Sequence, residues 1–213
     1  MRTCVIGCDG QDHRIGMTDD GELVLLDHDL DEEETLHVMD LGASFCFECL
    51  HDFRDNPTYM LWQASSCKDT GVFAMAIAAG ANVRLNDDDI LKRMSMNGRT
   101  EYVRQLLDAG ANVHAGGEES LIIAGREGHT EVVRLLLGAG ADVSVQNYTV
   151  LREAAAMGYG DIVRAVLQCG VEHRAKNEGL LAAYANGRKE LFDVFTEAGA
   201  DPGITVTGKW DSA

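Results

Sequence analysis

The sequence is poor in proline and in aromatic residues. Only 2 of its 213 residues are proline and 6% are aromatic, whereas 23 are glycine. A sandwich of β-strands would be richer in aromatic side chains, while many short helices that end at glycine need few of them. An apolar fraction of 46% excludes wholesale disorder. The composition therefore favours a folded, mainly α-helical protein.

Long apolar runs are also missing. The longest stretch without a charged residue, Thr70 to Val83, is shorter than the ~18 residues needed to cross a bilayer. The first residues reach Asp9 and Gly10 before a secretory apolar core could develop, so no signal peptide is predicted. Cys67 and Cys169 stand alone in the helical part of the chain, which suits reduced and buried thiols. We expect a cytoplasmic protein.

Basic residues are scarce. The chain has 18 Lys and Arg against 35 Asp and Glu, a net charge of −17. Residues 1–56 hold 15 acidic and 3 basic residues (net −12), and residues 57–213 hold 20 and 15 (net −5). Such a chain should repel nucleic acid and anionic membranes and attract another protein with a basic surface. The alternative is that the acidic residues serve only solubility.

Catalytic signatures are absent from the sequence. It shows no nucleotide-binding loop and no nucleophile in a known catalytic context. Two local pairs, Cys8 with His13 and Cys46 with His51, lack the flanking turn chemistry of known thiol nucleophiles. We therefore do not expect an enzyme.

What the sequence does contain is a repeat of 30 residues. Gly98, Gly128 and Gly158 recur at this spacing, and each is followed three positions later by an acidic residue and two apolar ones. A fifth unit slips by one position, because Leu180 lies 29 residues after Leu151. The other positions that keep the 30-residue step are Leu61, Leu91, Leu121 and Leu151 and Gly80, Gly110, Gly140 and Gly170. Five units in register predict a repeat fold.

Each unit reads as two short antiparallel helices. Residues 120–127 and 131–137 both place apolar side chains on one helical face. Gly128 should end the first helix in a left-handed turn, Thr130 should cap the second helix, and Gly140 should end it. Helices of roughly eight residues are not stable alone, so neighbouring units must stack.

These residues resemble a known repeat family. The segment Gly128-His-Thr-Glu-Val-Val-Arg-Leu-Leu-Leu-Gly-Ala-Gly-Ala-Asp-Val143 is similar to the second helix and outgoing turn of an ankyrin repeat. Thr149-Val-Leu-Arg-Glu-Ala154 resembles the start of such a repeat, with Val and Arg in place of the usual Pro and His. The period is shorter than the usual ~33 residues, which predicts short fingers. Trimmed repeats of this kind resemble those of large DNA viruses and some bacterial proteins, so a host cytosol is the expected location if the chain is viral.

The resemblance implies a mainly α fold: an ankyrin-repeat solenoid of about five helix-pair units over residues 57–202. The expected units are 57–86, 87–116, 117–146, 147–175 and 176–202, followed by a C-terminal tail over 203–213. Residues 1–56 fall outside the register, and we expect them to form a small acidic α+β domain or a cap over the first unit.

The resemblance also implies protein binding through the concave face, which the fingers and the exposed side of the first helices would line. Exposed aromatic and apolar side chains beside arginine suit a protein interface. The alternative is that Trp62 and Ile122 pack under the N-terminal region or a neighbouring repeat. Finger residues 87–89, Glu118 and Lys176 would extend the surface. The predicted partner-binding residues are Trp62, Lys92, Arg93, Met96, Ile122, Arg126, Tyr148, Arg152 and Glu153.

The N-terminal residues carry a possible metal site. Strands are expected over 3–7, 14–17 and 22–27, and a helix from Asp31 to Gly42. Four thiolates, Cys4, Cys8, Cys46 and Cys49, could hold a zinc ion. Residues four apart on a strand lie far from each other, however, so reduced cysteines in a small core are the alternative. No other cofactor is predicted.

The sequence thus favours a non-catalytic protein that binds another protein, with the acidic N-terminal region as a second contact. One alternative is an immunity or counter-defence inhibitor that occludes a basic toxin or nuclease. The other is a zinc-binding adaptor.

Overall fold

The structure is a computed structural model. It describes the backbone of residues 2–8, 11–17, 23–26 and 37–38, and it describes residues 57–66 and 70–205 more fully. The chain divides into two compact units, one of residues 1–86 with 108–111 and one of residues 87–107 with 112–213.

The first unit begins with four antiparallel strands in the order β1-β2-β3-β4. The strands are β1 (Arg2–Cys8), β2 (Gln11–Met17), β3 (Leu23–Leu26) and β4 (His37–Val38). The helix predicted from Asp31 to Gly42 is wrong at His37 and Val38, because these residues pair with β3 and satisfy backbone groups at its edge. The remainder of that predicted helix lies outside the described residues. The expected α+β domain or cap over residues 1–56 stays a prediction.

A pair of helices completes the first unit. Helix α2 (Pro57–Ala64) begins at a proline, which is favoured at the first helical position, and α3 (Thr70–Ala78) packs against it. Fully buried apolar residues line the contact, with Leu61 from α2 and Phe73 from α3 each at most 1% exposed. This pair matches the two helices that each repeat predicts.

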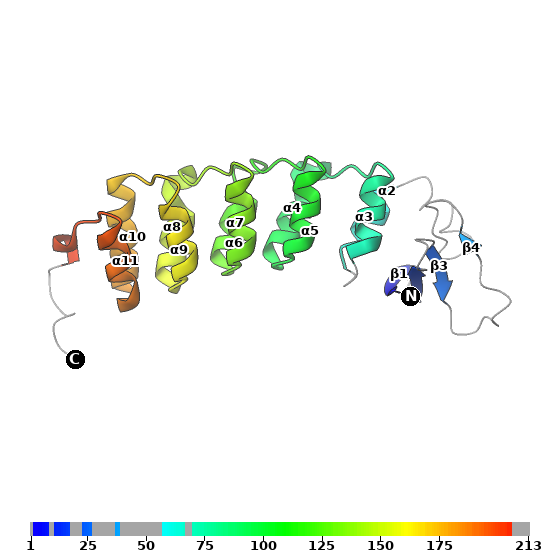
Figure 1. Ribbon diagram of the computed structural model, residues 1–213, viewed down its shortest axis with the longest axis horizontal. Helices are drawn as coiled ribbons and strands as arrows, with labels where there is room; N and C mark the ends of the chain where they lie inside the picture. Colours follow the sequence, from blue (N-terminus) through cyan, green and yellow to red (C-terminus); the bar gives the residue numbers. More distant parts are fainter. Residues whose placement is uncertain are drawn as a thin grey trace. The chain divides into compact units, whose positions relative to one another are not determined.

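The second unit is a row of helix pairs, seen side by side in Figure 1. First helices contact first helices, from α6 to α8 and from α8 to α10, and second helices α7 and α9 contact each other. The elements are α4 (Leu85–Met96), α5 (Thr100–Asp108), α6 (Glu119–Arg126), α7 (Thr130–Gly138), α8 (Val145–Met157), α9 (Gly160–Leu167), α10 (His173–Ala185), η2 (Lys189–Leu191), α11 (Phe192–Glu197) and η3 (Pro202–Thr205). The predicted stack of helix pairs is confirmed.

The core of this unit repeats with the sequence. Leu91, Leu121, Leu151 and Leu180 hold the same place in successive first helices, and none is more than 1% exposed. Burying a leucine contributes about 2 kcal/mol, so each pair is stabilised chiefly by its neighbours. Large and small side chains also compensate across a contact: a Cβ at Gly179 would lie 2.6 Å from the ring of Phe195.

The glycine turns form as expected, but the helix cap does not. Gly128 and Gly140 adopt φ values of 81° and 96°, a left-handed conformation in which glycine is favoured. Thr130, predicted to cap the second helix, is instead its first residue, and its amide donates to the carbonyl of Gly128. The turn carbonyl takes the role that a capping side chain was expected to play.

The connections between repeats contain a short left-handed turn. Residues 86–88, 116–118 and 146–148 all have φ between 50° and 66°. Glycine, asparagine and aspartate tolerate this conformation best, and they supply Gly116 and Gly117 in one turn and residues 86–88 in another. The turn directs side chains inward, because Asp88 and Glu118 are each 3% exposed. The prediction that these two residues are exposed at finger tips is therefore wrong.

Candidate functional site

The first helices of the second unit expose a continuous band of side chains, here called the first-helix face. Its members are the half-buried or exposed residues of the right-handed parts of these helices, within 89–96 (α4), 119–126 (α6), 149–157 (α8) and 173–185 (α10). Met96 (47% exposed) and Leu181 (39%) are its most open apolar side chains on α4 and α10. Of the residues predicted to bind a partner, those on this face are Lys92, Arg93, Met96, Ile122, Arg126, Arg152 and Glu153.

Two predicted binding residues lie elsewhere. Tyr148 lies in the left-handed turn before the right-handed part of α8 and is half-buried. Trp62 is a half-buried residue of α2 in the first unit and lines a cavity there. The binding role of all nine residues stays a prediction.

Lys92 is held between two carboxylates of successive repeats. Its Nζ lies 3.6 Å from Oδ2 of Asp87 and 3.3 Å from Oε2 of Glu119, and its side chain is 16% exposed. Desolvation is the largest single influence on the Lys92 pKa and lowers it, but the two carboxylates together outweigh it and raise the pKa above its ordinary value. Lys92 therefore ties repeats together, and a partner would have to compete for its charge.

The arginines of the first-helix face are also engaged locally. Nε of Arg126 lies 3.4 Å from the carboxylate of Glu127, and Nη2 of Arg152 donates to the hydroxyl of Thr149 at 3.1 Å. The carboxylate of Glu127 offsets the charge of Arg126, whereas the neutral hydroxyl of Thr149 leaves Arg152 charged. The half-buried apolar residues Ile122 and Ile123 lie on the same helix as Arg126.

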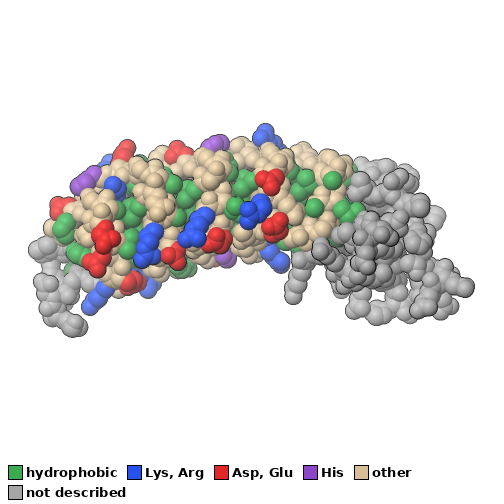
Figure 2. Space-filling model, in the orientation of Figure 1, with side chains coloured by type: hydrophobic (Ala, Val, Ile, Leu, Met, Phe, Trp, Pro, Cys, Tyr) green, Lys and Arg blue, Asp and Glu red, His purple; other side chains and the backbone are tan. Residues whose placement is uncertain are grey.

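The second helices carry a regular series of exposed ion pairs. Arg104, Arg134 and Arg164 each pair with the acidic residue three positions earlier, at 3.3, 2.7 and 3.1 Å. Figure 2 shows basic and acidic side chains recurring side by side along the helix pairs of the second unit. Each exposed pair contributes about 0–1 kcal/mol. Their main effect is to neutralise this surface within itself.

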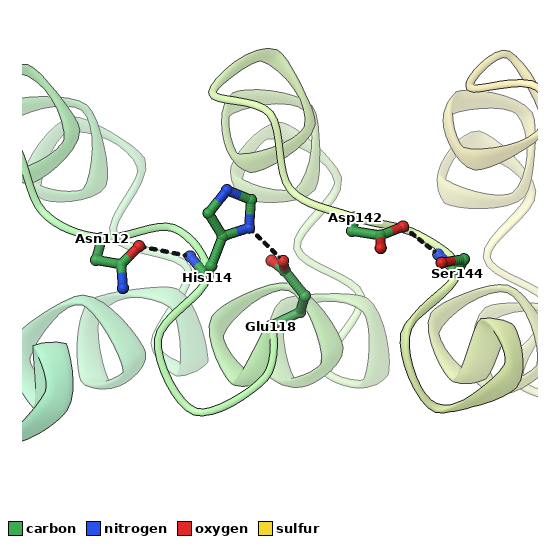
Figure 3. Close-up of polar contacts among 5 residues, drawn as sticks. All are labelled: Asn112, His114, Glu118, Asp142 and Ser144. Atoms are coloured by element: carbon green, nitrogen blue, oxygen red, sulfur yellow. Dashed lines mark hydrogen bonds and ion pairs between the residues drawn. The ribbon is translucent and has the colours of Figure 1, made fainter.

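A polar cluster occupies the outgoing turns of the second and third repeats (Figure 3). The side chains of Asn112 and Asp142 each accept the amide two residues later, from His114 at 3.2 Å and from Ser144 at 2.8 Å. Hydrogen bonds from the backbone and side chain of Ser144 lower the pKa of Asp142, and the charge of His114 adds to this. These Asx turns fix the start of each connection.

Within this cluster a buried carboxylate is only half satisfied. Nδ1 of His114 lies 2.5 Å from Oε1 of Glu118, and Oε2 of Glu118 is buried without a hydrogen-bond partner. An unpaired buried polar atom costs about 1–3 kcal/mol. Glu118 therefore contributes less to stability than its burial would suggest.

In two other repeats the residue at the same position accepts a backbone amide from the outgoing turn of its own repeat. Asp88 accepts the amide of Asn112 at 2.7 Å, and Asn177 accepts that of Asp201 at 2.8 Å. Each acceptor precedes its amide by 24 residues, as Glu118 precedes Asp142. We call this contact the amide clamp. It was not predicted from the sequence, although a short polar residue 24 positions before Asn112 and before Asp201 was a usable signal.

The proposed zinc ligands lie largely outside the described residues. Cys4 and Cys8 belong to β1, of which only the backbone is described. Cys46 and Cys49 lie outside the described residues. Among the residues with described side chains, no group of three or more His, Cys, Asp or Glu could hold a metal ion. The zinc site stays a prediction.

The prediction that Cys169 is a buried thiol is wrong, because this residue is exposed at the end of its helix pair. Its thiol still contacts the carbonyl of Ala165 at 3.5 Å, and desolvation raises its pKa.

Over the described part of the chain, every helix is too short or too polar to traverse a bilayer.

Comparison with known proteins agrees with this architecture. A family model described as ankyrin repeats (3 copies) matches residues 61–147 and again residues 91–177. The second match begins 30 positions after the first, which is the step of the repeat itself. No curated protein matches the chain.

Proposed function

Because the chain belongs to the ankyrin-repeat family, we propose that it is a non-catalytic protein that binds another protein through the first-helix face. Ankyrin repeats generally mediate protein–protein interaction and are typically not catalytic. The concave face that the family uses corresponds here to the exposed side of α4, α6, α8 and α10.

One contrast between two surfaces of the second unit carries this proposal. The second helices pair their exposed charges internally, as Arg134 does with Glu131. The first helices also pair some of their charges, but they carry the most exposed large apolar side chains on the described α-helices of this unit, including Met96, Met157 and Leu181. Methionine and arginine are among the residues enriched at protein interfaces. The first-helix face is therefore the better candidate for contact with a partner.

The charge of the chain supports a basic partner. Residues 1–56 carry a net charge of −12. This charge should speed encounter with a basic protein and make the association rate fall as salt is added. We infer that the acidic N-terminal region provides a second contact with the partner, in addition to the first-helix face.

The same charge favours a second candidate function, that of an inhibitor. A basic toxin or nuclease binds phosphate, and carboxylates can occupy such a site in place of the nucleic acid. The two candidates differ in outcome. An inhibitor would abolish the activity of the captured partner, whereas an adaptor would leave it active.

Capture of a partner from the native cell tests the proposal. The full chain is immobilised, and bound proteins are compared with those held by a variant with Ile122→Ala and Arg126→Ala. A matched control carries Leu137→Ala and Arg134→Ala on the second helix α7, which also removes one half-buried apolar and one exposed arginine side chain. We expect the first variant to lose the partner and the control to keep it.

The opposite result would place the interface elsewhere. If the control loses the partner and the Ile122 and Arg126 variant retains it, the first-helix face is not the binding surface. Assay of the captured protein, alone and in the complex, then separates an inhibitor from an adaptor.

A further inference from the structure

The first unit contains a cavity of about 340 Å³. Tyr59 and Trp62 of α2 line it together with Thr58, and Asn82 of the turn after α3 and Leu85, the first residue of α4, complete it. Tyr59 and Leu85 are each 40% exposed, so the cavity opens to solvent. None of these five lining residues is charged. All of them belong to the same compact unit.

Hydrogen bonds hold the walls of the cavity in place. The amide of Asn82 donates to Oγ1 of Thr58 at 2.8 Å, which fixes the segment after α3 against α2. Nε2 of Gln63 donates to the hydroxyl of Tyr59, also at 2.8 Å, four residues away on the same helix. Tyr59 and Trp62 are three residues apart and so share one face of α2. The two hydrogen bonds thus hold the segment after α3 and the hydroxyl of Tyr59.

Two aromatic rings in one small cavity favour a cation. The faces of tryptophan and tyrosine are electron-rich and attract ammonium or guanidinium groups. Of these two cations, guanidinium is planar, stacks on aromatic rings and is more weakly hydrated than ammonium, so its burial costs less hydration. A cavity of this size admits one long side chain.

The charge of the surrounding unit points the same way. Residues 1–86 and 108–111 contain 17 acidic and 5 basic residues, a net charge of −12. The remainder of the chain contains 18 and 13, a net charge of −5. A cation is therefore attracted to this unit at long range, and the aromatic cavity provides a binding site for it at short range.

We propose that the cavity of Tyr59 and Trp62 binds an arginine side chain of the partner protein. The inference rests on the proposed function, since it names the group by which a basic partner is held. It also gives Trp62 a role separate from that of the first-helix face.

A titration with small probes tests the site without the partner. N-acetyl-arginine methylamide is added to the full chain, and the indole N–H signal of Trp62 is followed by NMR. The other tryptophan, Trp210, is identified by Trp210→Phe. The citrulline analogue has the same shape without charge, and the norleucine analogue is apolar. We expect saturable binding of the arginine probe, with both analogues roughly fivefold or more weaker.

Two results would overturn the inference. One is binding of the citrulline or norleucine probe as tight as that of arginine, which would make the cavity a neutral or apolar site. The other is a Trp62 signal that none of the probes shifts.

A variant pair checks that the cavity itself is responsible. Tyr59→Leu keeps apolar bulk but removes one aromatic face, and should weaken the arginine probe several-fold while the melting curve of the chain is retained. Tyr184→Leu, on α10 of the second unit, is the control and should leave the affinity for the probe unchanged. Equal affinity in the wild type and the Tyr59 variant would place the probe outside the cavity.

The two proposals can fail separately. If partner capture depends on Ile122 and Arg126 but the arginine probe does not bind, only the cavity inference falls. If the probe binds but no partner is captured through the first-helix face, the proposed function falls and the cavity remains an arginine site.

Discussion

The imidazole of His129 lies over the α-carbon of Gly98, one repeat earlier. A Cβ added to Gly98 would be 2.6 Å from Nδ1 of His129, and Nε2 of His129 donates to the carbonyl oxygen of Met96 at 2.9 Å. A carbonyl only accepts, so Nε2 carries the proton. Gly98 thus serves two purposes, since it adopts a φ of 65° and leaves room for the next repeat.

This contact, in which the residue after one turn glycine packs on the turn glycine of the preceding repeat, is here called the bracket. It recurs along the second unit. The ring of Tyr159 would meet a Cβ on Gly128 at 2.8 Å, and Cδ of Arg188 would meet one on Gly158 at 3.0 Å. Nε of Arg188 also donates to the carbonyl of Ala156 at 3.0 Å. The residue after each turn glycine therefore fastens its repeat to the one before it.

Replacing Gly98 by alanine should be more damaging than the same change at Gly140. Both glycines have positive φ, which costs alanine about 1 kcal/mol. At Gly98 the new methyl also displaces His129 and its hydrogen bond, whereas nothing lies within 4 Å of a Cβ on Gly140. We expect urea unfolding to show a loss of about 2–4 kcal/mol for Gly98→Ala and about 1 kcal/mol for Gly140→Ala. Equal losses would show that the bracket contributes nothing.

Arg188→Ala should destabilise the chain although Arg134→Ala should not. Arg188 is half-buried and bonds a carbonyl of the preceding repeat, so its loss removes a hydrogen bond and packing. We expect a decrease in the free energy of unfolding of about 1–2 kcal/mol. Arg134 forms an exposed ion pair with Glu131, and its removal should cost less than about 0.5 kcal/mol. Thermal melting of both variants measures the difference.

Shortening Glu118 to aspartate should stabilise the protein. Aspartate at the same position in the preceding repeat, Asp88, accepts the amide of Asn112 at 2.7 Å. Aspartate at 118 should form the same amide clamp with Asp142 and remove the unpaired carboxylate oxygen, for a gain of about 0.5–1.5 kcal/mol. The reverse change, Asp88→Glu, should destabilise the chain by a similar amount. A loss of stability in Glu118→Asp would show that the contact with His114 is worth more than the clamp.

Asp142 should make stability depend on pH at the acid end. Its pKa in the folded chain lies below the ordinary value of 3.8, so the ionised form stabilises the fold at higher pH. That contribution is lost as pH falls below 3.8 towards the folded pKa. Asp142→Asn keeps an acceptor for the amide of Ser144, as Asn112 does for His114. At neutral pH we expect the free energy of unfolding of the wild type to exceed that of the variant by less than about 1 kcal/mol, because the side chain of Asp142 is exposed.

The measurement is urea unfolding of both proteins at neutral pH and near pH 3. The difference between them should be constant at neutral pH and shrink in acid. A difference that is the same at both pH values would exclude ionisation of Asp142 as its source.

Zinc removal tests the cysteine site directly. If Cys4, Cys8, Cys46 and Cys49 bind zinc, the purified chain should contain one equivalent, and a chelator should lower its melting temperature. Cys46→Ser should lose the metal, while Cys169→Ser, a matched change at an exposed thiol, should retain it. A metal-free chain with an unchanged melting temperature would remove this hypothesis.

The sequence by itself determined the repeat and its helices. Turn glycines such as Gly128 and buried leucines such as Leu121 act within one unit, through backbone conformation and helical periodicity. Both signals are local, so they can be read from spacing alone. The same signals identified the first helices, and with them the residues of the candidate binding face.

Only the tertiary structure decided the contacts between residues far apart in the sequence. The bracket of His129 on Gly98 joins two repeats across 31 residues, and the clamp of Asp88 on Asn112 closes one repeat across 24. Such contacts depend on how far the left-handed turns set successive helix pairs apart. That turn also buries Asp88 and Glu118, which sequence alone placed at exposed tips. The geometry of the connection, and not the chemistry of the residues, determines which polar side chains face solvent and which are buried within the stack.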